Sequence, residues 1–365
     1  MKNNELIMIY GNEYKEMTKR VLEAADLASE IGDRNAKIGL KPNLVVAREA
    51  SSGATTHPEI VAGVIEYLQD KGFQNIDVIE GSWVGDDTAS AYNASGIGAA
   101  AKKYGVKCYN LKRDSYTEVT AGGYPLRICD RALDCDMLIN LPVLKGHCQT
   151  TVTCALKNHK GIIPDAEKRR FHSQGLHKPI AHLGLAVKEN IREFIVVDNI
   201  CGDLDFEEGG NPVQMDRIFV AKDPVLCDAF VCETMGYSVD DVPYIRMAER
   251  LGVGDADISH AKITEIDADN KIRMPKKTTR RVDNLAKYVA ADDACSACYG
   301  QLIYALDRLN EEGGIRVKEK ICIGQGYRGK EGDGIGIGTC TRGLRRSCPG
   351  CPPTAKQMKD FLRNL

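Results

Sequence analysis

The sequence MLINLPVL, at residues 137–144, consists almost entirely of apolar side chains. A strand with one solvent-facing side alternates polar and apolar residues, whereas a strand covered by helices on both faces is continuously apolar. Residues 194–197 and 218–220 have the same continuously apolar pattern. We therefore predict a buried sheet with helices on both faces.

The chain before this segment alternates strand-like and helical patterns, as repeated strand–helix–strand units do. We expect a mainly parallel sheet that continues to about residue 270, and hence an α/β fold. Thr56 and Glu59 have the spacing of a helix capping box, which gives His57 a local structural role. The expected strands are 6–10, 37–40 and 76–79, and the helices that follow them are 14–31, 58–71 and 91–104.

A second unit is expected because 365 residues exceed the size at which a single core usually stops growing. The basic, proline-containing stretch KIRMPKKTTRR at 271–281 suggests a solvated connection. We predict an α/β domain at 1–275, a linker at 276–283 and a small α/β cysteine-rich metal-binding module at 284–365. The module should contain a helix at 298–309, a strand at 321–324, a glycine-rich stretch to residue 338 and a helix from about Thr354.

Composition limits the location and the partners. The formal net charge is -2, which argues against a nucleic-acid binder. The first residues lack a signal-peptide pattern, and no segment has the run of apolar residues that spans a bilayer. We expect a cytoplasmic protein with no membrane partner, in which the 14 cysteines stay reduced.

Five cysteines near the end of the chain are candidate metal ligands. Two pairs have the C-x-x-C spacing, which allows two thiolates to reach one metal centre, and each pair precedes a predicted helix. Cys322 lies in a strand-like run and is expected to be packed. Buried cysteines or a redox dithiol without metal are the alternative. The candidate ligands are Cys295, Cys298, Cys340, Cys348 and Cys351, four of which would bind the metal.

The spacing of these thiols favours an iron-sulfur cluster over zinc. The 49 residues between Cys298 and Cys348 exceed the spacing of about 15 to 20 in zinc ribbons, and zinc uses only four ligands. The C-x2-C-x2-C-x3-C-P run of bacterial ferredoxins is absent. We expect a 4Fe-4S cluster in a protein from an anaerobe, with zinc as the alternative.

The centre of the chain is basic and rich in histidine. Between Lys145 and Lys178, seven basic residues stand against two acidic ones, and five of the seven histidines lie between His147 and His182. Such a segment after a buried strand is typical of an anion-binding site in an α/β protein. Lysine can bind an anion, and histidine can exchange a proton near neutral pH. The candidate catalytic residues are Lys145, His147, Lys157 and His172; a structural role is the alternative for each.

A helix after Gln149 would place Thr150, Thr153, Cys154 and Lys157 on one face, which could line a pocket. The remaining thiols are assigned weaker roles. Cys227 and Cys232 lie in an apolar helical stretch and are expected in the core, while a catalytic role is open for Cys148 and Cys154. The thiols with no ligand spacing are Cys108, Cys129, Cys135 and Cys201.

Several stretches resemble the uncharacterised family called domain of unknown function 362. They are KPNLV (41–45), THPEIV (56–61), NLPVLKGH with TVTCALKNHKGIIP (140–164), VVDNICG (196–202) and AKDPVLCDAFVCETMG (221–236). Many members carry a ferredoxin-type domain with 4Fe-4S clusters, so the resemblance implies a redox context. This chain instead has the C-S-A-C and C-P-G-C-P-P pairs. The family motifs fall on Lys41, Asn43, Lys145, His147, Thr150, Lys157, Asn158 and His172, of which Lys41, Asn43, Thr150 and Asn158 are candidate cofactor-binding residues.

Three functions remain open at this point. The first is an oxidoreductase that acts on a small anionic substrate, or passes electrons to a second centre, with a redox partner protein such as a ferredoxin. The second is a non-redox isomerase or lyase with a structural cluster or zinc, because the architecture and the histidine group are similar to those of nickel-dependent racemases. The third is a non-enzymatic electron carrier or metallocofactor assembly factor.

Overall fold

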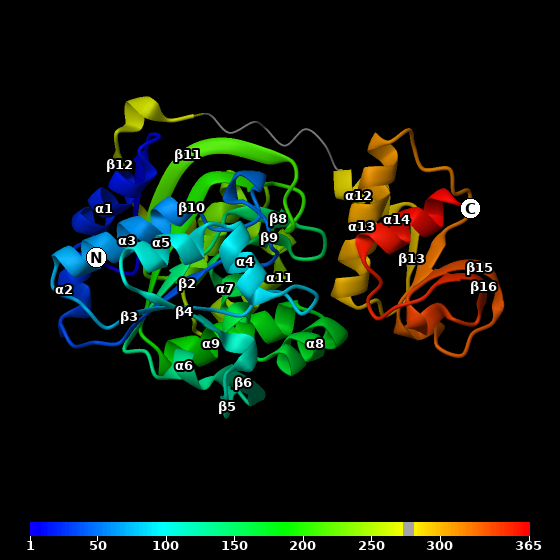
Figure 1. Cartoon of the computed structure of the whole chain (residues 1–365), viewed down its shortest axis with the longest axis horizontal. Helices are drawn as coiled ribbons and strands as arrows, with labels where there is room; N and C mark the ends of the chain where they lie inside the picture. Colours follow the sequence, from blue (N-terminus) through cyan, green and yellow to red (C-terminus); the bar gives the residue numbers. More distant parts are fainter. Residues whose placement is uncertain (273–280) are drawn as a thin grey trace. The chain divides into compact units, whose positions relative to one another are not determined.

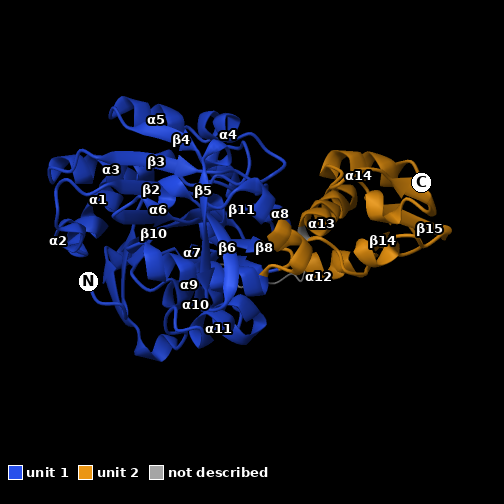
Figure 2. Cartoon of the chain, turned by 90° about the horizontal axis from the view of Figure 1, so that it is seen from below, with its two compact units in different colours: residues 1–146, 150–169, 177–276 blue, residues 147–149, 170–176, 277–365 orange. Residues whose placement is uncertain are grey.

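The computed structural model describes residues 1–272 and 281–365, apart from the side chain of Ser296. The chain forms two compact units, shown separately coloured in Figure 2. The first unit comprises residues 1–146, 150–169 and 177–276, and the second comprises 147–149, 170–176 and 277–365. Most of the expected linker, 276–283, lies outside the described residues, and its last residues belong to helix α12 (Arg281–Ala286).

The first unit is built on an eight-stranded sheet with the order β12-β1-β11-β10-β7-β2-β3-β4 (Figure 1). Strand β11 runs antiparallel to both of its neighbours, and the other pairs in the sheet are parallel. The predicted α/β class with a mainly parallel sheet is therefore confirmed. The strands are β1 (Glu5–Tyr10), β2 (Ile38–Pro42), β3 (Ile76–Glu80), β4 (Lys107–Asn110), β7 (Met137–Leu141), β10 (Glu193–Asp203), β11 (Pro212–Ala221) and β12 (Lys262–Ile266).

Helices cover this sheet on both sides (Figure 2). Helices α1 (Tyr14–Ala24), α3 (Pro58–Asp70) and α5 (Ile97–Lys103) bury their apolar residues in one core cluster with the strands. Helices α9 (His177–Asn190), α10 (Pro224–Thr234) and α11 (Pro243–Arg250) lie on the opposite side. The sheet therefore lies between two layers of helices, and its strand ends are not covered by these layers (Figure 2).

The structure corrects several local predictions. The expected helix 14–31 is divided into α1 and α2 (Leu27–Ile31), because Asp26 has the left-handed φ of 53°. The expected helix 91–104 is likewise two helices, α4 (Thr88–Ala94) and α5. The prediction of a capping box at Thr56 is wrong. The Thr56 hydroxyl donates to the Leu141 carbonyl oxygen, and α3 has no side-chain cap hydrogen bond.

The second unit has a four-stranded parallel sheet with the order β13-β14-β15-β16. The predicted helices and strand are present, and part of the glycine-rich stretch forms strand β15 within the sheet. The elements are β13 (Val289–Ala291), α13 (Ser296–Glu311), β14 (Ile321–Ile323), β15 (Gly332–Ile337), β16 (Leu344–Cys348) and α14 (Ala355–Arg363).

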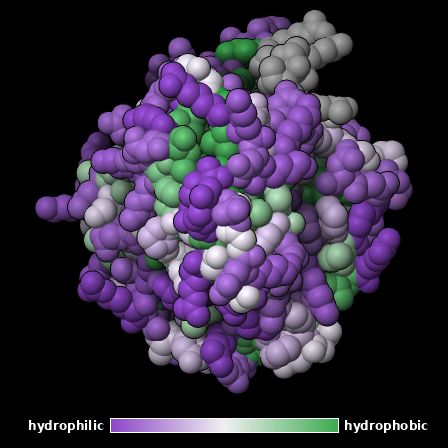
Figure 3. All heavy atoms as spheres, turned by 90° about the vertical axis from the view of Figure 1, so that its right-hand side faces the viewer, coloured by the Kyte–Doolittle hydropathy of each residue, from purple (hydrophilic) through white to green (hydrophobic). Residues whose placement is uncertain are grey.

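Hydrophilic side chains dominate the face of the molecule in Figure 3, with smaller apolar groups between them. Across the described part of the chain, we find no helix with the length and apolar content needed to cross a bilayer.

Candidate functional site

An ion pair lies at the carboxyl ends of two neighbouring parallel strands. Lys41 is near the end of β2 and Glu80 is the last residue of β3, and their Nζ and Oε2 atoms are 2.5 Å apart. Both side chains are almost completely buried. Burial lowers the pKa of Lys41 and raises that of Glu80, while the mutual attraction opposes both shifts. The family motif residue Lys41 is thus tied to the adjacent strand.

A directional chain of hydrogen bonds begins at Lys145. Its ammonium donates to Asn43 Oδ1 (3.0 Å), the Ala54 carbonyl oxygen (2.5 Å) and the Glu207 carbonyl oxygen (2.9 Å). Asn43 Nδ2 in turn donates to Asn158 Oδ1 at 3.0 Å. These three hydrogen bonds match the three N–H groups of a lysine ammonium. Lys145 therefore links the segments that contain Asn43, Ala54 and Glu207.

The chain continues through two further asparagines to a carboxylate. Asn158 Nδ2 donates to Asn140 Oδ1 at 2.7 Å, and Asn140 Nδ2 donates to Glu193 Oε1 at 2.8 Å. His159 Nε2 lies 2.5 Å from the same Glu193 oxygen. Each amide accepts on its oxygen and donates from its nitrogen, so the bonds polarise one another from the lysine cation to the carboxylate. This arrangement explains why the asparagines of these motifs are buried.

Three lysines of the basic centre, Lys145, Lys157 and Lys168, are buried. Lys157 donates to Glu207 Oε1 at 2.7 Å and to Thr153 Oγ1 at 3.1 Å. Burial lowers the pKa of Lys145 to about 8, that of Lys168 to about 8 and that of Lys160 to about 7. These amines therefore change charge near neutral pH, which is a property of functional sites as well as of buried ion networks.

The predicted helix after Gln149 is wrong. Residues Thr151–Thr153 form strand β9, with Thr151 at the left-handed φ of 64°, and helix α7 begins only at Ala155. The common face drawn through Thr150 and Lys157 therefore does not exist. Thr150 is buried, and its hydroxyl donates to the Val152 carbonyl oxygen at 3.2 Å.

The predicted catalytic residues fall in both units. Lys145 and Lys157 belong to the first unit, together with Lys41, Asn43, Thr150 and Asn158. His147 and His172 lie in the short segments that group with the second unit. The Gln149 backbone N–H donates to Nδ1 of His147 at 3.0 Å, so this ring nitrogen is an acceptor.

In the second unit, the carboxyl edge of the parallel sheet collects cysteines. Cys295 follows β13, Cys340 follows β15 and Cys351 follows β16, while Cys298 lies in the first turn of α13. Burial, and then the nearby Cys340 and Cys351, raise the pKa of Cys295. Burial, followed by Cys295, Cys351 and Cys340, raises the pKa of Cys298 to about 12. These four thiols therefore interact with one another across three loops.

Two further cysteines of this unit, Cys348 and Cys322, stand apart from that group. Cys348 is the last residue of β16, and burial alone raises its pKa, with no contribution from another thiol. Cys322 is in the middle of β14, and its thiol interacts with Tyr327. Cys348 is one of the five predicted ligands, but it lies outside this group of four thiols.

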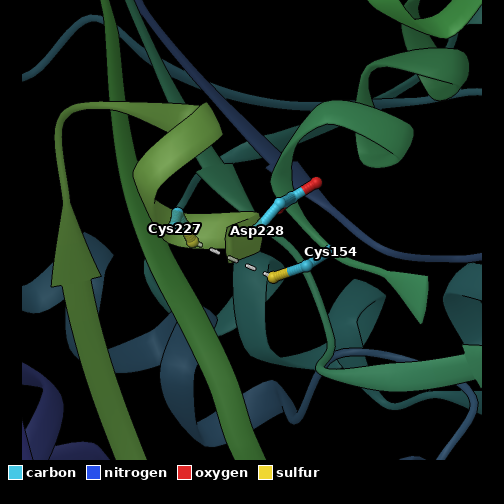
Figure 4. A group of neighbouring side chains, drawn as sticks. All are labelled: Cys154, Cys227 and Asp228. Carbon is cyan, nitrogen blue, oxygen red and sulfur yellow. Dashed lines mark hydrogen bonds between the residues drawn. The ribbon is translucent and has the colours of Figure 1, made fainter. Parts of the chain in front are cut away.

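A second group of possible metal ligands is enclosed in the first unit. Cys154 Sγ and Cys227 Sγ are 4.0 Å apart, with the carboxylate of Asp228 beside them (Figure 4). Asp228 accepts the backbone N–H groups of Ala155 and Leu156 at 2.7 and 3.2 Å, which caps helix α7. Burial raises the pKa of Asp228 to about 7. The predicted core position of Cys227 is confirmed, and Asp228 has a structural role at the start of α7.

Sequence reasoning missed a group formed by His57, Asp198 and Cys201. His57 Nδ1 lies 2.8 Å from Asp198 Oδ2, and His57 Nε2 lies 3.9 Å from Cys201 Sγ. The available signal was the presence of His57 and Cys201 in two stretches that both match family motifs, THPEIV and VVDNICG. Glu80 and Glu207, the carboxylate partners of Lys41 and Lys157, were missed as well.

Comparisons with known proteins relate the chain to others. It is 26% identical over 235 residues to the thylakoid-associated protein sll1697 of Synechocystis sp., covering 61% of this chain and 69% of that protein. Two solved structures are similar with a TM-score of 0.38 each. The lactate racemase apoprotein of Thermoanaerobacterium thermosaccharolyticum is 15% identical, with 59% of this chain and 54% of that chain covered. A Thermotoga maritima protein is 14% identical, with 71% and 62% covered.

A family profile described as a domain of unknown function, DUF362, matches residues 38–233, more than half of the chain. The matched region contains the lysine–asparagine chain and the group of His57, Asp198 and Cys201. It ends before the cysteine-rich segment at 281–365. The protein therefore belongs to the DUF362 family.

Proposed function

We propose that this protein is an iron-sulfur redox protein in which Cys295, Cys298, Cys340 and Cys351 bind a 4Fe-4S cluster. The observation that carries the proposal is the placement of the four cysteines, because Cys295, Cys340 and Cys351 follow strands β13, β15 and β16 of one parallel sheet and Cys298 lies in the first turn of α13. Loops that follow parallel strands meet at one edge of a sheet, and this brings residues distant in sequence to a common centre. Four thiolates are the ligand set of such a cluster.

A single zinc ion is the alternative occupant of this group of thiols. Tetrahedral zinc with Zn–S bonds of about 2.3 Å needs sulfur atoms about 3.8 Å apart. No three of these four sulfurs lie within 4.8 Å of one another.

The surroundings of the thiols also suit a cluster. Cys295 is the N-cap of the 16-residue helix α13, and the exposed N–H groups of a helix start stabilise thiolate charge. Arg328 Nε donates to Cys340 Sγ at 3.4 Å. At Gly338 a Cβ atom would lie 3.7 Å from Cys298 Sγ, so glycine keeps the space beside this thiol open. When bound, the cluster would accept and donate single electrons, and hydrogen bonds to its sulfur ligands would tune the potential.

We further propose that the electrons reduce a small anionic substrate or pass to a second centre. In the first unit, Lys145 and Lys157 supply buried positive charge at the carboxyl edge of the sheet, where α/β proteins bind ligands. His147 and His172 are proposed as proton donors, and a ferredoxin is a suitable class of redox partner. The candidate cofactor-binding residues of this site are Lys41, Asn43, Thr150 and Asn158.

The experiment that tests this function is a reductive titration of the protein purified without oxygen, followed by its visible spectrum. We expect a broad absorption that bleaches on addition of dithionite and returns on exposure to an oxidised ferredoxin. A protein with no dithionite-sensitive absorption would overturn the redox function. Lys157→Met should leave the dithionite bleaching intact, because Lys157 belongs to the first unit and the proposed cluster ligands belong to the second. The substitution should slow only the reoxidation of the cluster by the substrate.

A further inference from the structure

Three buried side chains of the first unit form a thiol–imidazole–carboxylate arrangement. Cys201 on β10 is 2% exposed, His57 immediately before α3 is 8% exposed and Asp198 on β10 is fully buried. The imidazole lies between the other two, with Nδ1 2.8 Å from Asp198 Oδ2 and Nε2 3.9 Å from Cys201 Sγ. A nucleophile next to a base that a third group orients is the general signature of nucleophilic catalysis.

The carboxylate that orients the imidazole is itself fixed. Asp198 Oδ2 also accepts the backbone N–H of His57 at 2.7 Å, and Oδ1 accepts the backbone N–H of Ile200 at 3.1 Å. Tyr14 packs the edge of its ring against the imidazole, with the ring centroids 5.9 Å apart. His57 is therefore held by both its main chain and its side chain, which directs Nε2 at the sulfur.

The charge on the imidazole determines the state of the thiol. The titratable groups that face His57 are Asp198, Cys201 and Tyr14. Burial opposes protonation of His57, but the Asp198 carboxylate outweighs it and raises the pKa of His57 to about 10. The imidazolium is thus present at neutral pH, and a cation beside sulfur stabilises a thiolate. The Cys201 thiol donates to the Ala50 and Ser51 carbonyl oxygens, at 3.5 and 3.8 Å.

We propose that Cys201 is a reactive nucleophile, activated by the His57 imidazole that Asp198 orients, and that it reacts with small soft electrophiles. In the reaction the thiolate sulfur forms a bond to an electrophilic carbon, and the bond from that carbon to its leaving group breaks. The leaving group departs with the bonding electron pair, and the thiol proton stays on His57. The low exposure of Cys201 restricts the electrophile to small, uncharged molecules.

This site does not depend on the proposed cluster. It is built entirely from the first unit, and none of the six cysteines of the last part of the chain takes part in it. Its test can therefore fail while the cluster proposal holds, and the reverse is also possible.

The test is the rate at which iodoacetamide alkylates Cys201 in the folded full-length protein, followed by peptide mass spectrometry at about pH 6 and pH 9. A free cysteine with a pKa of about 8.5 should react on the order of a hundredfold more slowly at the lower pH. We expect a change of less than about threefold for Cys201 in the native protein. In His57→Gln, the rate at pH 6 should fall at least about tenfold, and Asp198→Asn should also lower it.

Cys232 provides the control within the same digest. It is a fully buried thiol of α10 with no imidazole beside it, and it should stay unlabelled in the folded protein. The native pH profile decides the question even if His57→Gln does not fold. Cys201 that is unlabelled at both pH values, or whose rate follows an ordinary thiol titration, would overturn the proposal.

Discussion

His57 Nδ1 lies 2.8 Å from Asp198 Oδ2 inside the first unit, and this pair makes stability depend on pH. The pKa of His57 rises from 6.5 to about 10 in the folded protein. Protonation of a group whose pKa is raised on folding stabilises the folded state below the unfolded pKa. The stabilisation is therefore complete below about pH 6.5 and disappears as the pH rises to about 10.

For His57→Gln we predict a loss of unfolding free energy on the order of 4 kcal/mol near pH 6, which shrinks steadily toward pH 10. Urea unfolding at a series of pH values measures it. His260→Gln is the matched control, because that histidine pairs with Asp255 at 2.6 Å but is 60% exposed. The loss in His260→Gln should be much smaller, because solvent screens an exposed pair. A His57→Gln loss that is constant with pH would contradict the assignment of a charged His57.

The Lys41–Glu80 pair provides a test of the buried charges. Glu80→Ala leaves the Lys41 ammonium buried without its carboxylate, and we expect a loss of about 3 to 5 kcal/mol in the free energy of unfolding. The control is Asp134→Ala, which breaks an exposed pair with Lys37 at a similar distance of 2.7 Å. The loss in Asp134→Ala should be much smaller, because solvent screens an exposed ion pair. Equal losses in the two variants would show that the Lys41–Glu80 pair is not desolvated.

The chain of hydrogen-bonded asparagines predicts a large loss of stability when one asparagine is replaced by leucine, which has a similar size. Asn158→Leu leaves the Asn43 amide donor and the Asn140 carbonyl acceptor unpaired in a buried place. Each unpaired buried group costs about 1 to 3 kcal/mol, so we expect a total loss of about 2 to 6 kcal/mol by urea unfolding. Asn93→Leu, at an exposed position of α4, should change stability by less than about 1 kcal/mol. A neutral Asn158→Leu would contradict the chain.

The second unit predicts a difference between two cysteines close in sequence. Cys351→Ala removes one of the four interacting thiols and should lower the iron content of protein purified without oxygen to below about half. Cys348→Ala should retain the iron of the unchanged protein, because Cys348 lies outside the group. Iron analysis of both variants gives the result, and loss of iron in Cys348→Ala with retention in Cys351→Ala would reverse the assignment.

Patterns of hydrophobicity were sufficient to predict much of the fold. The strands at 6–10 and 76–79 and the final helix after Thr354 lie where their residues predict them, because periodicity and capping are local properties. The antiparallel placement of β11 between β1 and β10 depends on long-range pairing, which no local pattern specifies.

The sites were less predictable from the sequence, because they depend on contacts between residues that are distant in the chain. Thr56 and Glu59 match a capping box, yet the Thr56 hydroxyl bonds to the neighbouring strand β7 instead. In a regular strand Asp198 and Cys201 would point to opposite faces, and the β10–β11 register shifts between Asn199 and Cys201. The meeting of His57, Asp198 and Cys201 thus arises from tertiary structure. The C-x-x-C spacing, by contrast, predicted Cys295 and Cys298 as neighbours, because two residues in one helical turn are always close.

The central claim, a cluster bound by Cys295, Cys298, Cys340 and Cys351, is tested most directly by iron, acid-labile sulfide and zinc analysis of protein purified without oxygen. We predict about four iron and about four sulfide ions per chain, with no stoichiometric zinc. Stoichiometric zinc without iron or sulfide would contradict the claim and would make the cysteine group a structural metal site.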